Sequence, residues 1–198
     1  MSGGGPKGET TVIQPGPAER TVARRAAQSR ATVPHLELSV ARGVPGELET
    51  ALLIRASALA LIEHPRANGA YRDGHFELYS RINIGLVLAL QDAYLAPTLF
   101  DADQRTVPAL RRDVAALHDD ALGGRLVPSA FSGATFTVWN ASELGIAQAS
   151  LPVVPPQAAL LVAGTTSVTL ICDHRILYGA AAAGFLAAIS GRLEEASG

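Results

Sequence analysis

Hydrophobic and polar positions along the chain switch between helical and strand-like spacing. Apolar residues recur on one helical face in residues 17–31, 106–124 and 180–193, which predicts three amphipathic helices. Residues 48–63 are apolar nearly all round, a pattern typical of a helix buried between other elements. A threonine before the second helix, a proline in its first turn and a Gly-Gly pair after it mark the ends of that helix.

Extended segments separate these predicted helices. Branched and apolar residues predict strands in TVPHLELSV, FELYSRINIGLVLAL, AYLAPTLF, ATFTVWN and QAALLVAGTTSVTLICD, whereas HPRANGAYRDGH carries turn signals. Helices and strands are mixed throughout, without an internal repeat or an interior linker. The order predicts one α/β layered domain over residues 17–198, preceded by a glycine-rich segment, residues 1–16, that we expect to be disordered.

Composition narrows the classes of partner. The 198 residues are 48% hydrophobic and 17% charged and carry a net charge of -2, with arginines scattered along the chain. We therefore expect a soluble protein that binds neither nucleic acid nor membrane. The single cysteine, Cys172, excludes an internal disulfide and suits a reducing cytoplasm.

The stretch LICDHRILYGAAAAGFL places His174 between a predicted strand and a predicted helix. A histidine at such a strand end can move a proton near neutral pH, but a lone histidine can also be a hydrogen-bonded structural residue. Both interpretations remain open from the residues alone. No second histidine or carboxylate follows at a ligand-like spacing, so we expect no metal site here.

The segment DHRILYGAAAAGFL resembles the DHRxxDGAxxAxFL signature of the dihydrolipoamide acyltransferase catalytic domain of 2-oxoacid dehydrogenase complexes. Further similar segments occur in the same order: ARRAAQSRATVPHLELSV, RINIGLVLAL, PTLFDAD, GATFTVWNASELGI and PPQAALLVAG. This family is related to chloramphenicol acetyltransferase. The resemblance implies a two-layer α/β sandwich with a mixed sheet, assembled as a homotrimer whose active sites lie between subunits.

The resemblance assigns the role of general base to His174, which would take a proton from the thiol of coenzyme A or dihydrolipoamide. A thiol with a pKa near 8.5, or a hydroxyl with a far higher one, needs such a base before it can attack a thioester. Acyl-coenzyme A is thus the implied co-substrate, with no metal. The family's oxyanion-stabilising hydroxyl falls on Trp139, next to Asn140 and near Ser142. These residues could supply a substitute donor, or Trp139 could simply fill the cavity.

A second departure from the family is Tyr178, where relatives carry an aspartate or asparagine that pairs with an arginine near the chain start. Arg24 or Arg25 would be that arginine here, and tyrosine can hydrogen-bond an arginine or a carbonyl in place of a salt bridge.

The resemblance also gives roles to three further residues. Asp173 and Arg175 are expected to be structural at the site. His35 is a possible substrate contact, with structural packing as the alternative.

The segment between PPQAALLVAG and DHR is shorter than in the family, which predicts a simplified sheet edge and an altered acceptor channel. The sequence also shows no lipoyl or peripheral-subunit-binding domain, so we do not expect membership in a dehydrogenase complex. The leading hypothesis is a stand-alone transferase that moves an acyl group from acyl-coenzyme A to a small-molecule hydroxyl or amine, for example in tetronate-type natural-product biosynthesis. The alternatives are a noncatalytic trimeric scaffold, or a cavity repurposed for a coenzyme-free cyclisation or elimination.

Overall fold

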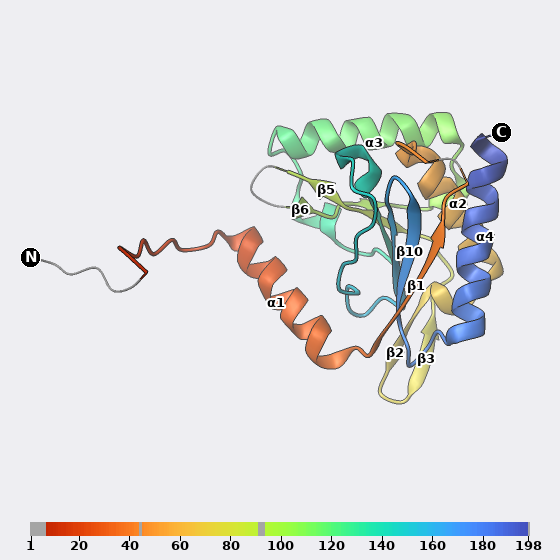
Figure 1. Ribbon diagram of the computed structural model, residues 1–198, viewed down its shortest axis with the longest axis horizontal. Coiled ribbons are helices and arrows are strands. Elements are labelled where there is room, and N and C mark those ends of the chain that lie inside the picture. The colour runs from red at the N-terminus through yellow and green to blue at the C-terminus, as the bar shows by residue number, and fades with distance from the viewer. Residues whose placement is uncertain (1–6, 44, 91–93, 198) are drawn as a thin grey trace, which may run out of the picture.

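The computed structural model describes residues 7–43, 45–90 and 94–197, whose centre is a mixed six-stranded sheet (Figure 1). In spatial order the strands are β1 His35–Ala41, β10 Ser167–Asp173, β9 Ala159–Ala163, β8 Phe136–Asn140, β4 Ile84–Leu86 and β7 Thr98–Leu99. The pairs β8–β9 and β4–β8 are parallel, and the others are antiparallel. Two small hairpins pair β2 Gly69–Arg72 with β3 His75–Leu78, and β5 Leu88–Ala89 with β6 Tyr94–Leu95.

The helices pack as one layer against the sheet, except for the first. Helices α2 (Thr50–Glu63) and α4 (Gly179–Ser197) contact the sheet, and α3 (Val107–Leu122) packs against α2. Helix α1 (Pro17–Thr32) projects away from this domain (Figure 1). Short 3-10 turns complete the chain: Pro65–Ala67, Ala102–Gln104, Pro128–Phe131 and Ala141–Leu144.

The sheet is covered on both faces, which explains why β9 is apolar without interruption. On the face of the sheet that the helices cover, Leu161 packs in the main core with residues of α2 and α4. Leu160 and Val162 point to the opposite face of the sheet. There they pack with Trp139 and with the apolar residues of the segment that follows β8, including Val153. All five residues of β9 are consequently buried.

The predicted α/β sandwich with a mixed sheet is confirmed, and each predicted helix forms within a few residues of its expected bounds. The helix predicted over 48–63 is the core helix α2, and its residues Leu53, Ile54 and Leu61 are almost fully buried. The threonine expected to cap the 106–124 helix does so, because Thr106 Oγ1 accepts a hydrogen bond from the Ala109 N–H at 3.4 Å. The expected disordered segment, 1–16, lies partly outside the described residues, and residues 7–16 hold none of the helices or strands named above.

Two expectations for the strands were wrong. Residues 64–75, expected to be a turn, contain a 3-10 turn and β2, because the Asp73–Gly74 turn closes a hairpin inside this stretch. The segment 157–173 forms two antiparallel strands joined by a tight turn. Strand β10 therefore lies between β1 and β9, so the shortening lies at the tip of the β9–β10 hairpin and not at a sheet edge.

Gly164 begins this tight turn and lies against the segment after β8. A Cβ atom on Gly164 would sit 2.0 Å from the Ala147 carbonyl oxygen, which is a backbone atom and cannot rotate away. We expect Gly164→Ala to destabilise the fold by about 1–3 kcal/mol through overpacking, seen as a lower melting temperature in circular dichroism. The matched control is Gly191→Ala, where α4 offers open space and a gain of about 0.5–1 kcal/mol is expected. An equal change in both variants would contradict the close approach at Gly164.

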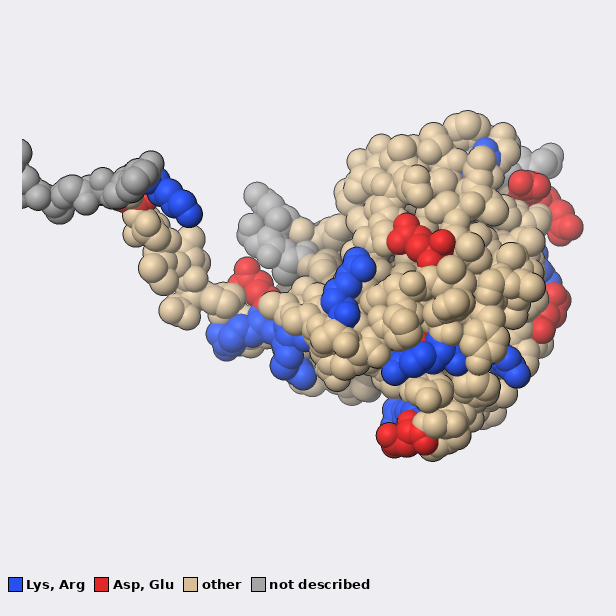
Figure 2. Space-filling view, turned by 60° about the horizontal axis from the view of Figure 1, so that its bottom comes forward, with Lys and Arg blue, Asp and Glu red and all other residues tan. Residues whose placement is uncertain are grey.

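Charge is spread unevenly between the domain and the projecting segment. Figure 2 shows acidic and basic side chains mixed over this face of the domain, while basic side chains gather on the segment that carries α1. That helix contains four arginines, namely Arg20, Arg24, Arg25 and Arg30. Within the described part of the chain, none of the helices combines the length and the apolar character needed to cross a membrane.

Candidate active site

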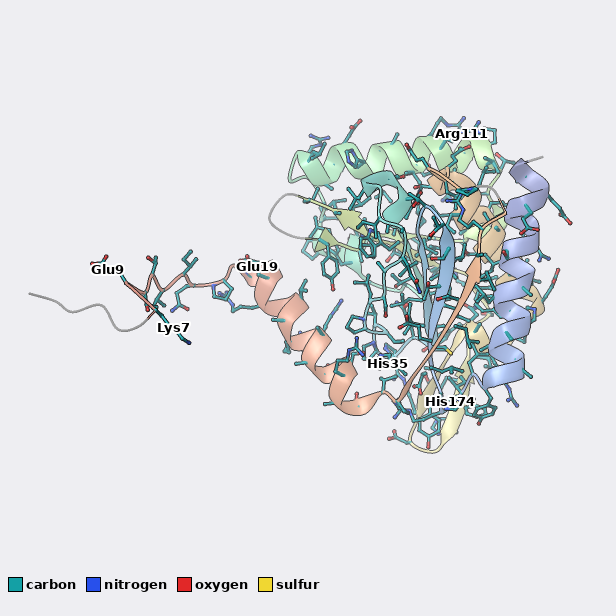
Figure 3. The ribbon with its side chains drawn as sticks, in the orientation of Figure 1. Lys7, Glu9, Glu19, His35, Arg111 and His174 are labelled. Atoms are coloured by element: carbon teal, nitrogen blue, oxygen red, sulfur yellow. The ribbon has the colours of Figure 1, made fainter. Side chains whose placement is uncertain are left out.

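His174 lies at the end of the sheet, in the connection between β10 and α4 (Figure 3). Its backbone N–H donates a hydrogen bond to the Pro34 carbonyl at 2.8 Å, which ties the connection to the residue before β1. The residue itself is exposed. The ring of Tyr178 stands edge-on to the imidazole, with 6.2 Å between the ring centroids. The backbone is thus fixed while the imidazole remains accessible.

The two neighbours of His174 neutralise each other. The Asp173 side chain is 4% exposed and accepts three hydrogen bonds from the Arg175 guanidinium: Nε to Oδ1 at 2.9 Å, Nε to Oδ2 at 3.2 Å and Nη2 to Oδ2 at 2.7 Å. The Arg175 backbone N–H also donates to Asp173 Oδ1 at 2.9 Å. This pairing raises the pKa of Arg175 above its usual value. Asp173 and Arg175 therefore brace the loop and are not free to contact a substrate as charges.

A stack of aromatic rings and arginines continues from this loop onto the β2–β3 hairpin. The Arg175 guanidinium lies 4.7 Å from the Tyr71 ring centroid, and the Tyr71 ring is 6.2 Å from that of Phe76. Arg66 covers the other end of the stack, 5.2 Å from the Phe76 ring. The hairpin thus supports the histidine loop from outside the sheet. The turn signals around Tyr71 do not predict this support, because they indicate a turn and not the short strands beside it.

Of the two partners expected for the Tyr178 hydroxyl, an arginine or a carbonyl, the structure shows a carbonyl. The Tyr178 hydroxyl donates to the Arg175 carbonyl at 3.0 Å, so the tyrosine fixes its own loop. Arg24 and Arg25 are exposed on α1, and neither contacts Tyr178 within the described residues. Burial raises the pKa of Tyr94, and the positive charge of Arg25 opposes that shift, which places Arg25 near β6. Within one copy of the chain, the described residues show no contact of Arg24 or Arg25 with Tyr178, so the structural role expected for these arginines stays a prediction.

His35 pairs with Asp173 across β1 and β10, but its ring is occupied by structural contacts. Nε2 accepts a hydrogen bond from the Val153 N–H at 3.1 Å and lies 3.3 Å from the Ser29 hydroxyl. Burial lowers the pKa of His35, and the positive charge of Arg30 lowers it further. The neutral ring thus links α1, β1 and the segment after β8, which is the structural packing given as the alternative to a substrate contact for His35.

The lowered pKa of His35 predicts a dependence of stability on pH. The unfolded chain binds this proton near the usual pKa of about 6.5, before the folded chain does. The contribution of neutral His35 is therefore complete above about pH 6.5 and is lost as the pH falls through the lowered folded pKa.

Melting temperatures measured between about pH 8 and pH 5 test this dependence. The acid loss should be smaller in His35→Gln, which cannot take up the proton, than in the wild type. His75→Gln, at an exposed histidine of β3, should leave the wild-type profile unchanged. Parallel profiles for wild type and His35→Gln would show that His35 does not cause the acid loss.

Asn140 and Ser142 belong to a buried hydrogen-bond network, which corrects their predicted roles as donors to substrate. Asn140 Nδ2 donates to the Leu48 carbonyl at 2.6 Å and to Thr50 Oγ1 at 2.8 Å, while its Oδ1 accepts from the Ser142 hydroxyl at 2.6 Å. The Leu48 N–H donates to Ser142 Oγ at 2.8 Å. Both residues are 3% exposed. They join the end of β8 to the start of α2 and have no contact left for a ligand.

Trp139 lies far from His174 within one chain. Trp139 pairs with Val162, and Val162 pairs with Thr169, which is five residues before His174 along β10. At about 3.3 Å per residue, this offset separates the two residues by roughly 17 Å along the strands. The indole is partly buried against the apolar cluster around Val162, and its N–H has no acceptor among the described residues. The structure therefore does not bring His174 and Trp139 into one site in a single copy.

Cys172 is a buried core residue, as expected from the sequence. It is fully buried, and burial raises the pKa of its thiol to about 12. It is not a nucleophile at neutral pH. No group of three or more histidine, cysteine, aspartate or glutamate side chains is placed to hold a metal ion within the described ranges.

The chain is similar in sequence to known acyltransferases. The family model described as 2-oxoacid dehydrogenases acyltransferase (catalytic domain) matches residues 48–198. The dihydrolipoyllysine-residue acetyltransferase component of the mitochondrial pyruvate dehydrogenase complex of Dictyostelium discoideum is 29% identical over 90% of this chain. The chain spans 34% of the length of that relative.

Solved structures share the overall fold of this chain. A probable dihydrolipoamide acetyltransferase from Listeria monocytogenes superposes with a TM-score of 0.89 at 25% identity, covering 94% of this chain and 95% of that one. A chloramphenicol acetyltransferase superposes with a TM-score of 0.56 at 12% identity, covering 86% of this chain and 94% of that one, which shows the shared fold alone. The chain belongs to the 2-oxoacid dehydrogenase acyltransferase catalytic-domain family, a family of acyltransferases with the chloramphenicol acetyltransferase-like fold.

Proposed function

We propose that the chain transfers an acyl group from acyl-coenzyme A to a small-molecule hydroxyl or amine, with His174 as the general base. One observation carries the proposal: an exposed imidazole stands on a loop whose other charged groups, Asp173 and Arg175, are paired with each other. Membership in an acyltransferase family supports the same chemistry. The charged flanking residues thus fix the loop, and the imidazole is the group left to move a proton.

The chemistry of this proposal uses one proton and one nucleophile. The imidazole of His174 takes the proton as the acceptor oxygen or nitrogen attacks the thioester carbonyl. The tetrahedral intermediate carries a negative oxygen, which needs a donor, and it collapses when the carbon–sulfur bond breaks. The imidazolium then returns the proton to the departing thiolate of coenzyme A, so the histidine leaves the cycle unchanged.

A complete site requires a second copy of the chain. Because Trp139 is roughly 17 Å from His174 along the strands of one copy, its indole N–H could serve the developing oxyanion only beside the His174 of a neighbour. We place this site between subunits of a homotrimer. The free indole N–H and the exposed imidazole, at opposite ends of the sheet, both support a composite site.

A noncatalytic binding role is the second candidate. Two observations favour it: Trp139 occupies the place of the family's hydroxyl donor, and Tyr178 stands edge-on to the His174 ring at 6.2 Å. In that case the aromatic side chains fill the channel, and the chain binds a ligand without turning it over.

Thiol release from acetyl-coenzyme A and longer acyl-coenzyme A donors separates these functions. The acceptor panel contains alcohols, amines and dihydrolipoamide, because the named relatives are dihydrolipoyllysine-residue acetyltransferases. Acceptor-dependent thiol release from the purified full chain supports acyl transfer and identifies the acceptor class. A folded oligomer that binds acyl-coenzyme A without releasing thiol from any donor would support the binding role instead.

A further inference from the structure

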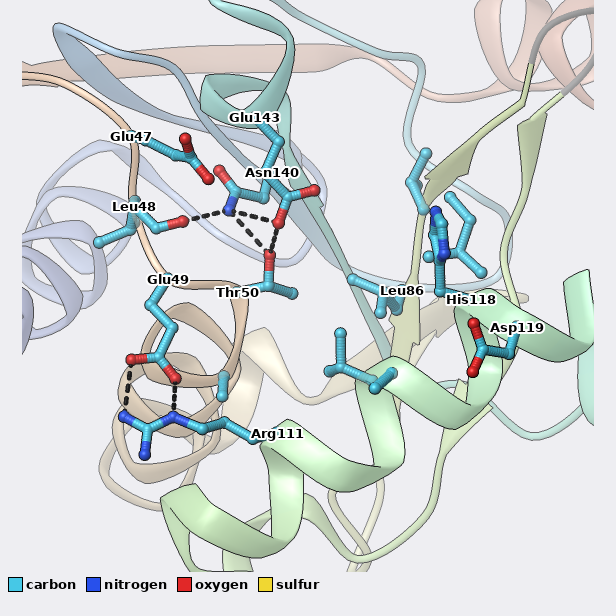
Figure 4. A pocket seen from close by; sticks show the side chains of 15 residues that line it. Glu47, Leu48, Glu49, Thr50, Leu86, Arg111, His118, Asp119, Asn140 and Glu143 are labelled. Atoms are coloured by element: carbon cyan, nitrogen blue, oxygen red, sulfur yellow. Dashed lines mark hydrogen bonds and ion pairs between the residues drawn. The ribbon is translucent and has the colours of Figure 1, made fainter. Parts of the chain in front are cut away.

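A hollow of about 400 Å³ opens where the start of α2 meets α3 and the ends of β4 and β8 (Figure 4). Its apolar lining comes from Leu86 and Leu88 on the sheet side and from Val114 on α3. This volume lies within the usual range for sites that hold small molecules. Apart from the buried Asn140, none of the residues in its wall was assigned to acyl transfer.

The wall of the hollow carries an excess of negative charge. Arg111 in this wall is bound to Glu49 by a two-point ion pair that includes Nη2 to Oε2 at 2.9 Å, and this pair lowers the pKa of Glu49. The other basic side chain of the wall is His118, which lies beside Asp119 (Figure 4). Glu47, Asp119 and Glu143 form no ion pair with lysine or arginine in the described part of the chain. Three carboxylates thus surround an apolar lining without a permanent cation to balance them (Figure 4).

Glu143 is held in a fixed orientation by neutral donors. Its Oε1 accepts a hydrogen bond from the Thr50 hydroxyl and another from Asn140 Nδ2 at 3.2 Å. Thr50 and Asn140 are themselves buried. The second oxygen, Oε2, has no hydrogen-bond partner among the described residues. A carboxylate that is already oriented, charged and open on one oxygen can bind a cation without first losing side-chain freedom.

We infer that this hollow binds a small organic cation, with an ammonium head at Glu143 and an apolar body against Leu86, Leu88 and Val114. An ammonium group offers three hydrogen-bond donors and one positive charge, which suits the open oxygen of Glu143 and the neighbouring Glu47. Asp119 adds negative charge from the α3 side of the hollow (Figure 4). The apolar lining excludes strongly hydrated metal ions as the best-matched ligands, because such ions prefer several oxygen ligands at close range. This site is additional to the proposed transfer reaction and does not depend on it.

Titration calorimetry on the full chain tests the inference with 2-phenylethylammonium as the probe. Its neutral analogue 2-phenylethanol, which has the same apolar body, should bind at least about tenfold more weakly. Glu143→Gln should weaken ammonium binding by at least about tenfold, because it removes the charge and keeps the shape. Glu195→Gln is the matched control, since it removes one exposed carboxylate from α4 and should leave the dissociation constant unchanged.

Several outcomes would overturn the inference. These are equal binding of the alcohol and the ammonium, no binding of the ammonium to the wild type, or equal effects of Glu143→Gln and Glu195→Gln. If Glu143→Gln proves unfolded by circular dichroism, Glu47→Gln replaces it, because Glu47 makes no side-chain hydrogen bond that the fold requires. His174→Ala should bind the probe like the wild type, so a failure here and a failure of acyl transfer are distinguishable.

Discussion

Replacing His174 by alanine is expected to slow acceptor-dependent thiol release by ~10²- to 10⁴-fold, the usual contribution of a general base. The imidazole is exposed and makes no side-chain hydrogen bond in the described residues, so its removal should leave the fold intact. The measurement is the rate of coenzyme A release under saturating acyl-coenzyme A, compared at equal concentrations of folded protein. The loss should appear in kcat, because the histidine moves a proton and does not hold the donor.

The control for this prediction is His75→Ala, another exposed histidine, on β3. It removes the same group from the surface and should retain the wild-type rate. A His174→Ala variant with full activity would exclude His174 as the base. A loss of equal size in both variants would point to a general surface effect and would contradict the assignment.

The second large effect is expected for stability. Arg175→Ala leaves the carboxylate of Asp173, whose side chain is only 4% exposed, without its counter-charge. Breaking a buried ion pair from one side costs about 3–5 kcal/mol, and we expect the lower end because the Arg175 side chain is itself 34% exposed. For a domain of this size, about 3 kcal/mol lowers the melting temperature by roughly 6–12 °C.

Arg192→Ala provides the comparison for this measurement. Arg192 pairs with Glu63, whose side chain is 56% exposed and can be hydrated after the pair is broken. The change should therefore stay within about 1 kcal/mol. Calorimetric scans of the two variants at one pH and salt concentration compare the pairs directly. Similar shifts for the two variants would contradict this prediction. They would mean that water reaches the Asp173 carboxylate once Arg175 is removed, as it reaches the exposed Glu63.

The parts of the fold that periodicity determines were predictable from the sequence. The all-round apolar pattern of 48–63 gave the core helix, and the alternation of branched residues located β1 and β8. The hairpin around Tyr71 was missed, because glycine, proline and asparagine are turn signals whether or not short strands flank the turn. The boundary between β9 and β10 was also missed, since a run buried on both faces carries no alternation.

The candidate site was harder to predict, since its contacts depend on long-range pairing. The motif located His174, but the bond from the Val153 N–H fixes His35 across 118 residues of sequence, and local spacing gives no sign of it. Likewise, Ser142 looked available because its partner Leu48 lies 94 residues earlier. The distance between His174 and Trp139 follows only from the register of three strands.

The separation of Trp139 from His174 within one copy should make the activity depend on protein concentration. If each site takes His174 from one copy and Trp139 from its neighbour, an isolated copy holds two half-sites and no whole one. Specific activity should then fall on dilution once the assembly dissociates. Mixing a His174 variant with a Trp139 variant, each inactive alone, should restore about one quarter of the sites when copies combine at random. By the same arithmetic, either variant mixed alone with the wild-type chain should leave one whole site for each wild-type copy, so neither variant should lower the activity per wild-type chain.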